Sequence, residues 1–349
     1  MHVFNVPPSI PFLRSVIAAL IDGALVDGFE ARQHPERLAQ ATLYLPTRRA
    51  VRMARDVFLD VLDSDAAILP RLVALGDIDE DELAFAQAAS NPATTLETPP
   101  ALGSLARRLT LTRLIIAWAT ALRPDDPGDA RLVVTGPASA LALADDLARL
   151  MDDMATRGVS WDKLDALVPS EHDYYWKLTL DFLKIARQAW PQYLLEQGKI
   201  GAMVRRDRLI AAEAARLTAS HNGPVIAAGS TGSMPATAQF LHTIAKLPQG
   251  AVVLPGLDTD LDDEAWQAIG GATSGEESSP GHPQFALHGL LARFGLKRSD
   301  VTPLGIGAAH GREMLMSEAM RPSSTTAQWR HRLKDAAIEI GRASCRERV

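Results

Sequence analysis

Residues 41–62 read ATLYLPTRRAVRMARDVFLDVL, and this stretch indicates the fold class. It opens with an apolar run of strand length at 41–45, and a helical pattern follows at 48–62. The N-terminus has the same order, with a strand at 3–6 (VFNV), a loop (PPSIP) and a helix at 12–26. Two successive strand–turn–helix units predict an α/β fold with a parallel sheet and right-handed crossovers.

The sheet is expected to resume after a long helical region. Val225–Ala228 (VIAA) and Ala251–Leu254 (AVVL) are apolar runs of strand length, and Pro235 suits the first turn of a helix between them. Further helices are expected to start after Pro100 and at Pro137, to run from about 171 to a kink or end at Pro191, and to cover 263–269, 283–294 and 326–340.

This pattern predicts five segments. They are the first part of an α/β domain at 1–78, an inserted helical domain at 79–222, the second part of the α/β domain at 223–300, the start of a following segment at 301–340, and a tail at 341–349. The tail, GRASCRERV, differs sharply from what precedes it and is interpreted as non-native. The abrupt end also favours a piece of a longer protein.

Composition narrows the classes of function. Hydrophobic residues make up 47% of the chain and charged residues 22%, which is typical of globular proteins. No apolar run approaches the roughly 18 residues that span a bilayer, and the N-terminus lacks the regions of a signal peptide. We therefore expect a cytoplasmic protein without a membrane partner. The single cysteine, Cys345, excludes disulfides and thiolate metal centres within the chain.

The net charge argues against bulk electrostatic binding of nucleic acid. The formal charge is −6, and it becomes −8 without the tail, which contributes +2. Any contact with DNA would therefore need a local group of basic residues or a basic partner.

The loop after the first strand lacks the chemistry of a phosphate cradle. A P-loop exposes glycine N–H groups to phosphates and supplies a lysine and a magnesium-binding hydroxyl. Residues 6–15 instead read VPPSIPFLRS, without glycine or lysine. Proline has no N–H to donate. Pro7, Pro8 and Ser9 therefore predict a degenerate nucleotide loop.

A second loop, GSTGSM at 229–234, lies between a strand and a helix. Its N–H groups could bind an anion at the helix N-terminus, but it matches no nucleotide-binding motif and has no lysine. A tight strand-to-helix turn is the alternative. The preceding strand ends in Ala228, Gly229 and Ser230, so the acidic pair that would hold magnesium in an ATPase is missing. No cofactor is expected.

Two acidic runs are candidate cation sites. Residues 258–264 (DTDLDDE) depart from EF-hand spacing, so they favour a solvated loop with a helix N-cap over a metal site. Residues 76–83 (GDIDEDEL) have a similar pattern, typical of acids near the start of a helix.

Arginines form the candidate phosphate contacts. Thr47 precedes a helix in which Arg48, Arg52 and Arg55 share one face, with Arg49 beside them. A helix N-terminus with a hydroxyl and arginines can grip phosphate, although a solvated helix face is an equal alternative. Arg205, Arg206 and Arg208 leave the same two alternatives open. Neither HExxH nor GxSxG occurs, so no catalytic residue or metal ligand is assigned.

Several segments together resemble a known family. They are FNVPPSIPFL, LYLPTRRAVRMARDVFL, LPRLVALGDIDEDEL, PVIAAGSTGSMPATAQFL, LPQGAVVLPGLDTDLDDEAW and HPQFALHGLLARFG, in this order. They are similar to the N-terminal part of AddB of the alphaproteobacterial type, a subunit of the AddAB helicase–nuclease that processes double-strand breaks for recombination. The resemblance covers nearly all of residues 1–340.

The resemblance implies a superfamily 1 helicase-like core that has lost its ATPase motifs. By position, Pro7, Pro8 and Ser9 would stand at the former P-loop and Gly229 and Ser230 at the former Walker B acids. LPTRR would correspond to a motif that contacts single-stranded DNA, through Thr47, Arg48, Arg49 and Arg52. The family further implies AddA as the active motor and partner, and DNA that this region scans.

Three functional hypotheses follow. The first is a non-catalytic, helicase-like region that holds or scans DNA beside AddA. The second is a stand-alone enzyme that binds a phosphorylated or nucleotide ligand at the Gly229–Ser233 loop. The third is an interaction scaffold without DNA contact, which differs from the first only in the role of the arginines.

Overall fold

The computed structural model describes residues 1–75, 98–122, 136–165, 174–221, 223–271, 278–307, 311–329 and 332. The chain divides into two compact units, one formed by Met1–Leu83 with Glu213–Val349 and the other by Ala84–Ala212. The predicted acidic segment 76–83, most of the predicted helix 326–340 and the tail 341–349 lie outside the described residues.

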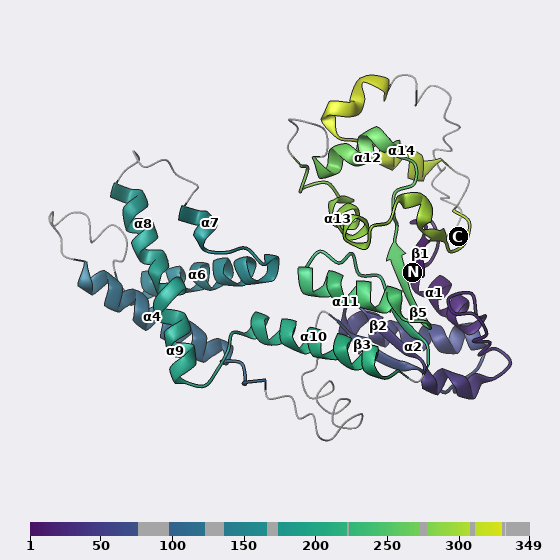
Figure 1. The fold of residues 1–349 in the computed structure, drawn as a ribbon, viewed down its shortest axis with the longest axis horizontal. Coiled ribbons are helices and arrows are strands. Elements are labelled where there is room, and N and C mark those ends of the chain that lie inside the picture. The colour runs from purple at the N-terminus through teal and green to yellow at the C-terminus, as the bar shows by residue number, and fades with distance from the viewer. Residues whose placement is uncertain are drawn as a thin grey trace, which may run out of the picture. The chain divides into compact units, whose positions relative to one another are not determined.

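The first unit is α/β and contains a six-stranded sheet in which every pairing is parallel (Figure 1). The strand order is β3-β2-β4-β5-β1-β6. The strands are β1 (Val3–Val6), β2 (Thr42–Leu45), β3 (Arg71–Ala74), β4 (Val225–Ala228), β5 (Gly250–Pro255) and β6 (Thr302–Pro303). The parallel sheet predicted from the sequence is therefore confirmed.

Helices follow most strands of this unit. They are α1 (Phe12–Ile21), the 3-10 helix η1 (Pro35–Gln40), α2 (Arg48–Leu62), α11 (Pro235–Lys246), α12 (Asp263–Gly270), α13 (Phe285–Phe294), η3 (Arg298–Asp300), α14 (Arg312–Ala319) and η4 (Ser323–Gln328). The helices predicted at 48–62 and 263–269 and the one opened by Pro235 are confirmed.

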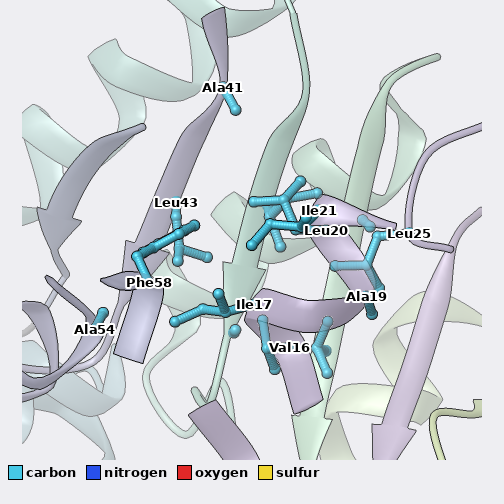
Figure 2. Close-up of a cluster of buried hydrophobic side chains, with 14 of the residues drawn as sticks. Val16, Ile17, Ala19, Leu20, Ile21, Leu25, Ala41, Leu43, Ala54 and Phe58 are labelled. Atoms are coloured by element: carbon cyan, nitrogen blue, oxygen red, sulfur yellow. The ribbon is translucent and has the colours of Figure 1, made fainter. Parts of the chain in front are cut away.

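Side chains of the central strands alternate between two cores, as the period of two in a strand requires. On one face, Leu43, Ile226 and Val253 pack with α1 and α2, as Figure 2 shows for Ile17, Leu43 and Phe58. On the other face, the Tyr44 ring meets that of Phe240 from α11 edge-on, with centroids 5.0 Å apart. Both faces are covered, which explains why these strands are continuous apolar runs.

A buried polar cluster lies on the Tyr44 face of the sheet. The Tyr44 hydroxyl donates to the Glu213 carboxylate, which also accepts two hydrogen bonds from Arg216. Arg71 of β3 lies 3.4 Å from the same carboxylate. Burial alone would raise the pKa of Glu213, but the bonds from Arg216 and Tyr44 outweigh it and hold the pKa below its ordinary value. The carboxylate therefore stays charged in the core.

The structure corrects several expected elements. The first helix ends at Ile21 rather than 26, because Gly23 takes the left-handed conformation, with φ +77°, that commonly ends a helix. Glycine fits this position, since an added Cβ would lie 2.9 Å from the Phe29 carbonyl oxygen. The edge strand β3 was not predicted. Residues 302–303, expected to begin a following segment, add β6 beside β1. Residues 323–328 form a 3-10 helix where an α-helix was expected from 326.

The described part of the second unit is helical, as predicted. Its helices are α4 (Ser104–Ala121), α6 (Pro137–Arg157), α7 (Asp162–Asp165), α8 (Tyr174–Lys184), the π-helix η2 (Ile185–Ala189) and α9 (Trp190–Glu196), and α10 (Ala202–Ala219) leads back to the sheet. The chain stays helical through Pro191, because the π turn ends just before it and Pro191 occupies the first turn of α9. The π turn thus ends, and α9 begins, directly before Pro191, where a kink or helix end was expected.

The Phe58 ring should be a main source of stability in the first unit. Its side chain is fully buried in the core of Figure 2. We expect Phe58→Ala to lower the free energy of unfolding by about 3–5 kcal/mol, because it removes apolar burial and leaves a cavity. Met53→Ala is the control, since Met53 lies on the same helix but is 48% exposed. Urea denaturation followed by circular dichroism measures both, and equal losses would contradict this packing.

Candidate functional site at the carboxyl edge of the sheet

The loops that follow β1, β2, β4 and β5 lie at one edge of the sheet, because all these strands are parallel. Ligands of open α/β sheets bind in the crevice outside this edge. The loops approach each other closely here. A Cβ added at Gly229 would lie 3.1 Å from the Phe12 ring and 3.4 Å from Pro46 Cγ. The carboxyl edge therefore brings the loops after β1, β2 and β4 into contact.

The loop after β1 is closed by a carboxylate of the protein itself. The backbone N–H of Ser9 donates to Glu313 Oε1 at 2.8 Å, and Glu313 comes from α14. The neighbouring Pro7 and Pro8 have no N–H. Where a P-loop would offer its N–H groups to a phosphate, this loop has two, and both are used: that of Ser9 holds a carboxylate and that of Ile10 bonds the Pro7 carbonyl at 3.3 Å.

The GSTGSM loop also uses its backbone donors internally. The N–H of Gly229 donates to the Val253 carbonyl at 3.0 Å, and the N–H of Gly232 lies 3.4 Å from Ser230 Oγ. Gly232 takes φ +60°, and an added Cβ would lie 2.6 Å from Leu290. These contacts are typical of a tight turn between β4 and α11, which is the alternative to an anion-binding loop.

The arginines of α2 lie at the same edge. Thr47 is the N-cap of the helix, and its Oγ1 accepts a hydrogen bond from the Ala50 N–H at 3.1 Å. Arg48, Arg49 and Arg52 follow in the first turns and are exposed to solvent. The first N–H groups of a helix have no partner within it, and they carry partial positive charge. This helix start can therefore receive a phosphate group.

The acidic run after β5 is used for structure. Asp262 is the N-cap of α12, accepting from the Ala265 N–H at 2.9 Å, which confirms the predicted cap. Asp258 Oδ1 accepts from the Leu261 N–H and from Ser317 Oγ, each at 3.0 Å. Within the described part of the chain, no group of three or more acidic, histidine or cysteine side chains could hold a metal ion.

The second basic group lies in the other unit. Arg205, Arg206 and Arg208 are on α10, where Arg205 Nε donates to the Pro99 carbonyl at 3.2 Å. Arg205 and Arg206 are half-buried and Arg208 is exposed. This group therefore gives less accessible positive charge than the start of α2.

Sequence reasoning missed Glu313 and the ion pairs near it. Arg321, almost fully buried, pairs with Glu318 at 2.8 Å and with Asp262 at 2.9 Å, and Arg332 contacts the same two carboxylates. The bonds from Arg321 hold the pKa of Glu318 below its ordinary value. Glu318 is in α14 and Arg321 lies just beyond its end, and this helix was not predicted.

Comparisons with known proteins add no family. The sequence matches no protein-family model, and a search of curated proteins finds no match. No helix within the described ranges is long and apolar enough to cross a membrane.

The Ser9–Glu313 bond gives a test of the closed loop. We expect Glu313→Ala to lower the free energy of unfolding by about 1–3 kcal/mol, because it removes a charge-assisted acceptor from a half-buried N–H. Glu313→Gln keeps an acceptor oxygen and should lose less. Urea denaturation of the two variants measures the difference. If both behave alike, the bond does not stabilise the loop.

Proposed function

We propose that this chain is a non-catalytic, helicase-like region of a DNA-repair subunit of the AddB type. In this proposal it holds or scans DNA beside an active AddA motor and binds no nucleotide cofactor of its own. The observation that carries the proposal is the pairing of two features at one edge of the sheet. The first loop is closed by Glu313, and exposed arginines stand at the start of α2.

The loss of nucleotide chemistry is supported at two places. The Ser9 N–H is held by a carboxylate, and β4 ends in alanine and glycine where magnesium-binding acids would be needed. A phosphate brought near the Ser9 N–H would be repelled by the negative charge of the Glu313 carboxylate that this N–H already bonds. A protein that still turned over ATP here would need both a cradle and a metal-binding acid.

The DNA contact is supported by the geometry of α2. Val51, Ala54 and Phe58 are buried, so the helix is fixed to the sheet by one face. Its first turn and its arginines are left toward solvent at the carboxyl edge. Phosphate contacts of this kind position a nucleic acid without reading its sequence. A local basic group of this type is what an acidic chain needs in order to bind DNA.

The arginines of α2 carry the first prediction from this proposal. We expect Arg48→Ala combined with Arg49→Ala to weaken binding of a fluorescent oligothymidine to the full chain about tenfold at low salt. The plot of log K against log salt should become shallower by about 1.4, since each phosphate contact on a single strand contributes about 0.7. Fluorescence anisotropy titrations at several salt concentrations measure both quantities.

The control is Arg113→Ala combined with Arg293→Ala, which removes the same charge from exposed positions on α4 and α13. An equal effect would mean that only net charge matters. Unchanged affinity in the α2 variant would instead favour the scaffold hypothesis without DNA contact. In a complex with AddA, the α2 variant should leave ATPase turnover per bound motor unchanged, because the motor is on the other subunit.

The alternative enzyme hypothesis makes the opposite prediction for nucleotide. We expect isothermal titration of the chain with ATP and Mg²⁺ to give no heat of binding. The first loop is closed by Glu313, and in the second loop the N–H groups of Gly229 and Gly232 already bond other atoms of the protein. Micromolar affinity that Gly229→Ala abolishes would favour a nucleotide-binding enzyme at the Gly229–Ser233 loop. Gly295→Ala, at a helix end with φ +67° but away from these loops, controls for strain.

A further inference from the structure

A cavity of about 590 Å³ opens beside the closed loop. It lies beyond the carboxyl ends of β1, β5 and β6, and its wall includes Pro7, Gly256, Pro303 and residues of α14. The volume falls within the range of small-molecule sites, about 300–1,000 Å³. The function proposed above makes no use of this cavity.

The inner wall of the cavity is fixed by side-chain to backbone hydrogen bonds. The buried Asn5 amide bonds the backbone of Leu257 in both directions, at 2.8 and 3.3 Å. Gln284 bonds the Gly256 carbonyl at 3.0 Å and the Asp258 N–H at 3.1 Å. A Cβ at Gly256 would lie 3.2 Å from Pro8. The wall is therefore organised before any ligand arrives, which lowers the cost of binding.

The charged side chains of the wall are mostly acidic, and they favour a positively charged ligand. Asp258, Asp260 and Glu313 line the cavity from two directions, and Arg312 lines it as well. Partial burial and the charges of Asp258 and Glu313 together raise the pKa of Asp260. Carboxylates that repel one another in this way are stabilised by a cation placed between them. An anion such as a nucleotide phosphate is disfavoured at the same place.

Another part of the wall is apolar. Met316 of α14 and Met320, the residue after this helix, line the cavity, yet they remain 56% and 46% exposed. Exposed methionines beside a cavity are typical of adaptable binding surfaces. Pro283 and Pro303 add further apolar contact. A bare metal ion would leave these side chains unused, whereas a cation on an aliphatic chain would cover them.

We propose that this cavity binds an aliphatic guanidinium or ammonium group. Its charged end would lie between Asp260 and Glu313, and its methylene chain would lie on Met316 and Met320. A free polyamine and an arginine or lysine side chain of a protein share this chemistry. Guanidinium suits the site well, because its planar donors can meet two carboxylates at once.

The primary probe is butylguanidinium, and butylurea is its neutral analogue of nearly the same shape. We expect butylguanidinium to shift the methyl resonances of Met316 and Met320 in the full chain labelled with ¹³C-methyl methionine. Butylurea should bind at least about tenfold more weakly, since it lacks the charge that strengthens hydrogen bonds to carboxylates. Spermidine represents a free polyamine, and the peptide acetyl-Gly-Arg-Gly-amide represents an arginine side chain of a protein. Their relative affinities show which of the two kinds of ligand the cavity prefers.

Two variants place the binding in this cavity. Asp260→Asn and Glu313→Gln should each weaken butylguanidinium binding about tenfold. Glu264→Gln is the control, because Glu264 is an exposed acid of α12 that does not line the cavity. Circular dichroism of each variant shows whether it is folded.

Three results would overturn the proposal. One is no saturable shift of the two methyl groups at millimolar butylguanidinium. Another is equal affinity for butylurea, and the third is equal weakening by Glu264→Gln. Because the probes contain neither nucleotide nor DNA, this result is independent of the DNA and ATP titrations.

Discussion

Parallel pairing of every strand is the constraint from which the rest of this molecule follows. It sends the loops after β1, β2, β4 and β5 to one edge, where they share a small space. A Cβ added at Gly229 would lie in tight contact with Phe12 and Pro46, and Gly256 lies against Pro8. The loops thus support one another, and the conformation of each depends on residues far away in the sequence. Any function of this edge is a property of the assembled sheet.

The edge is divided by charge. Around β1 and β5, Glu313 and Asp260 make the surface acidic, and the Ser9 N–H is already bonded. At the start of α2, exposed arginines and the positive end of the helix dipole make it basic. A nucleotide would have to bind on the acidic side, where its phosphates are repelled, whereas a nucleic acid backbone could follow the basic side. This division favours a scaffold for a polyanion over an ATP-driven motor within this unit.

The sequence was sufficient for the elements whose signals are local. The apolar runs at 3–6, 42–45, 225–228 and 250–255 and the capped helix α2 could all be predicted, because burial on two faces and a threonine cap leave clear patterns. The edge strand β3 was missed because it has four residues and begins with a charged one, Arg71, whose partner Glu213 comes 142 residues later. Glu313 was missed for the same reason, since 304 residues separate it from Ser9. Charge compensation across such distances leaves no periodic signal.

The central claim is that this edge of the sheet binds nucleic acid at α2 and has no nucleotide site. Hydrogen–deuterium exchange of the full chain tests it most directly, with an oligothymidine in one sample and Mg²⁺-ATP in another. We expect slower exchange of the first-turn amides of α2 with the oligothymidine, and no change at 7–11 or 229–233 with Mg²⁺-ATP. Protection of 229–233 by Mg²⁺-ATP, with α2 unaffected by the oligothymidine, would contradict it.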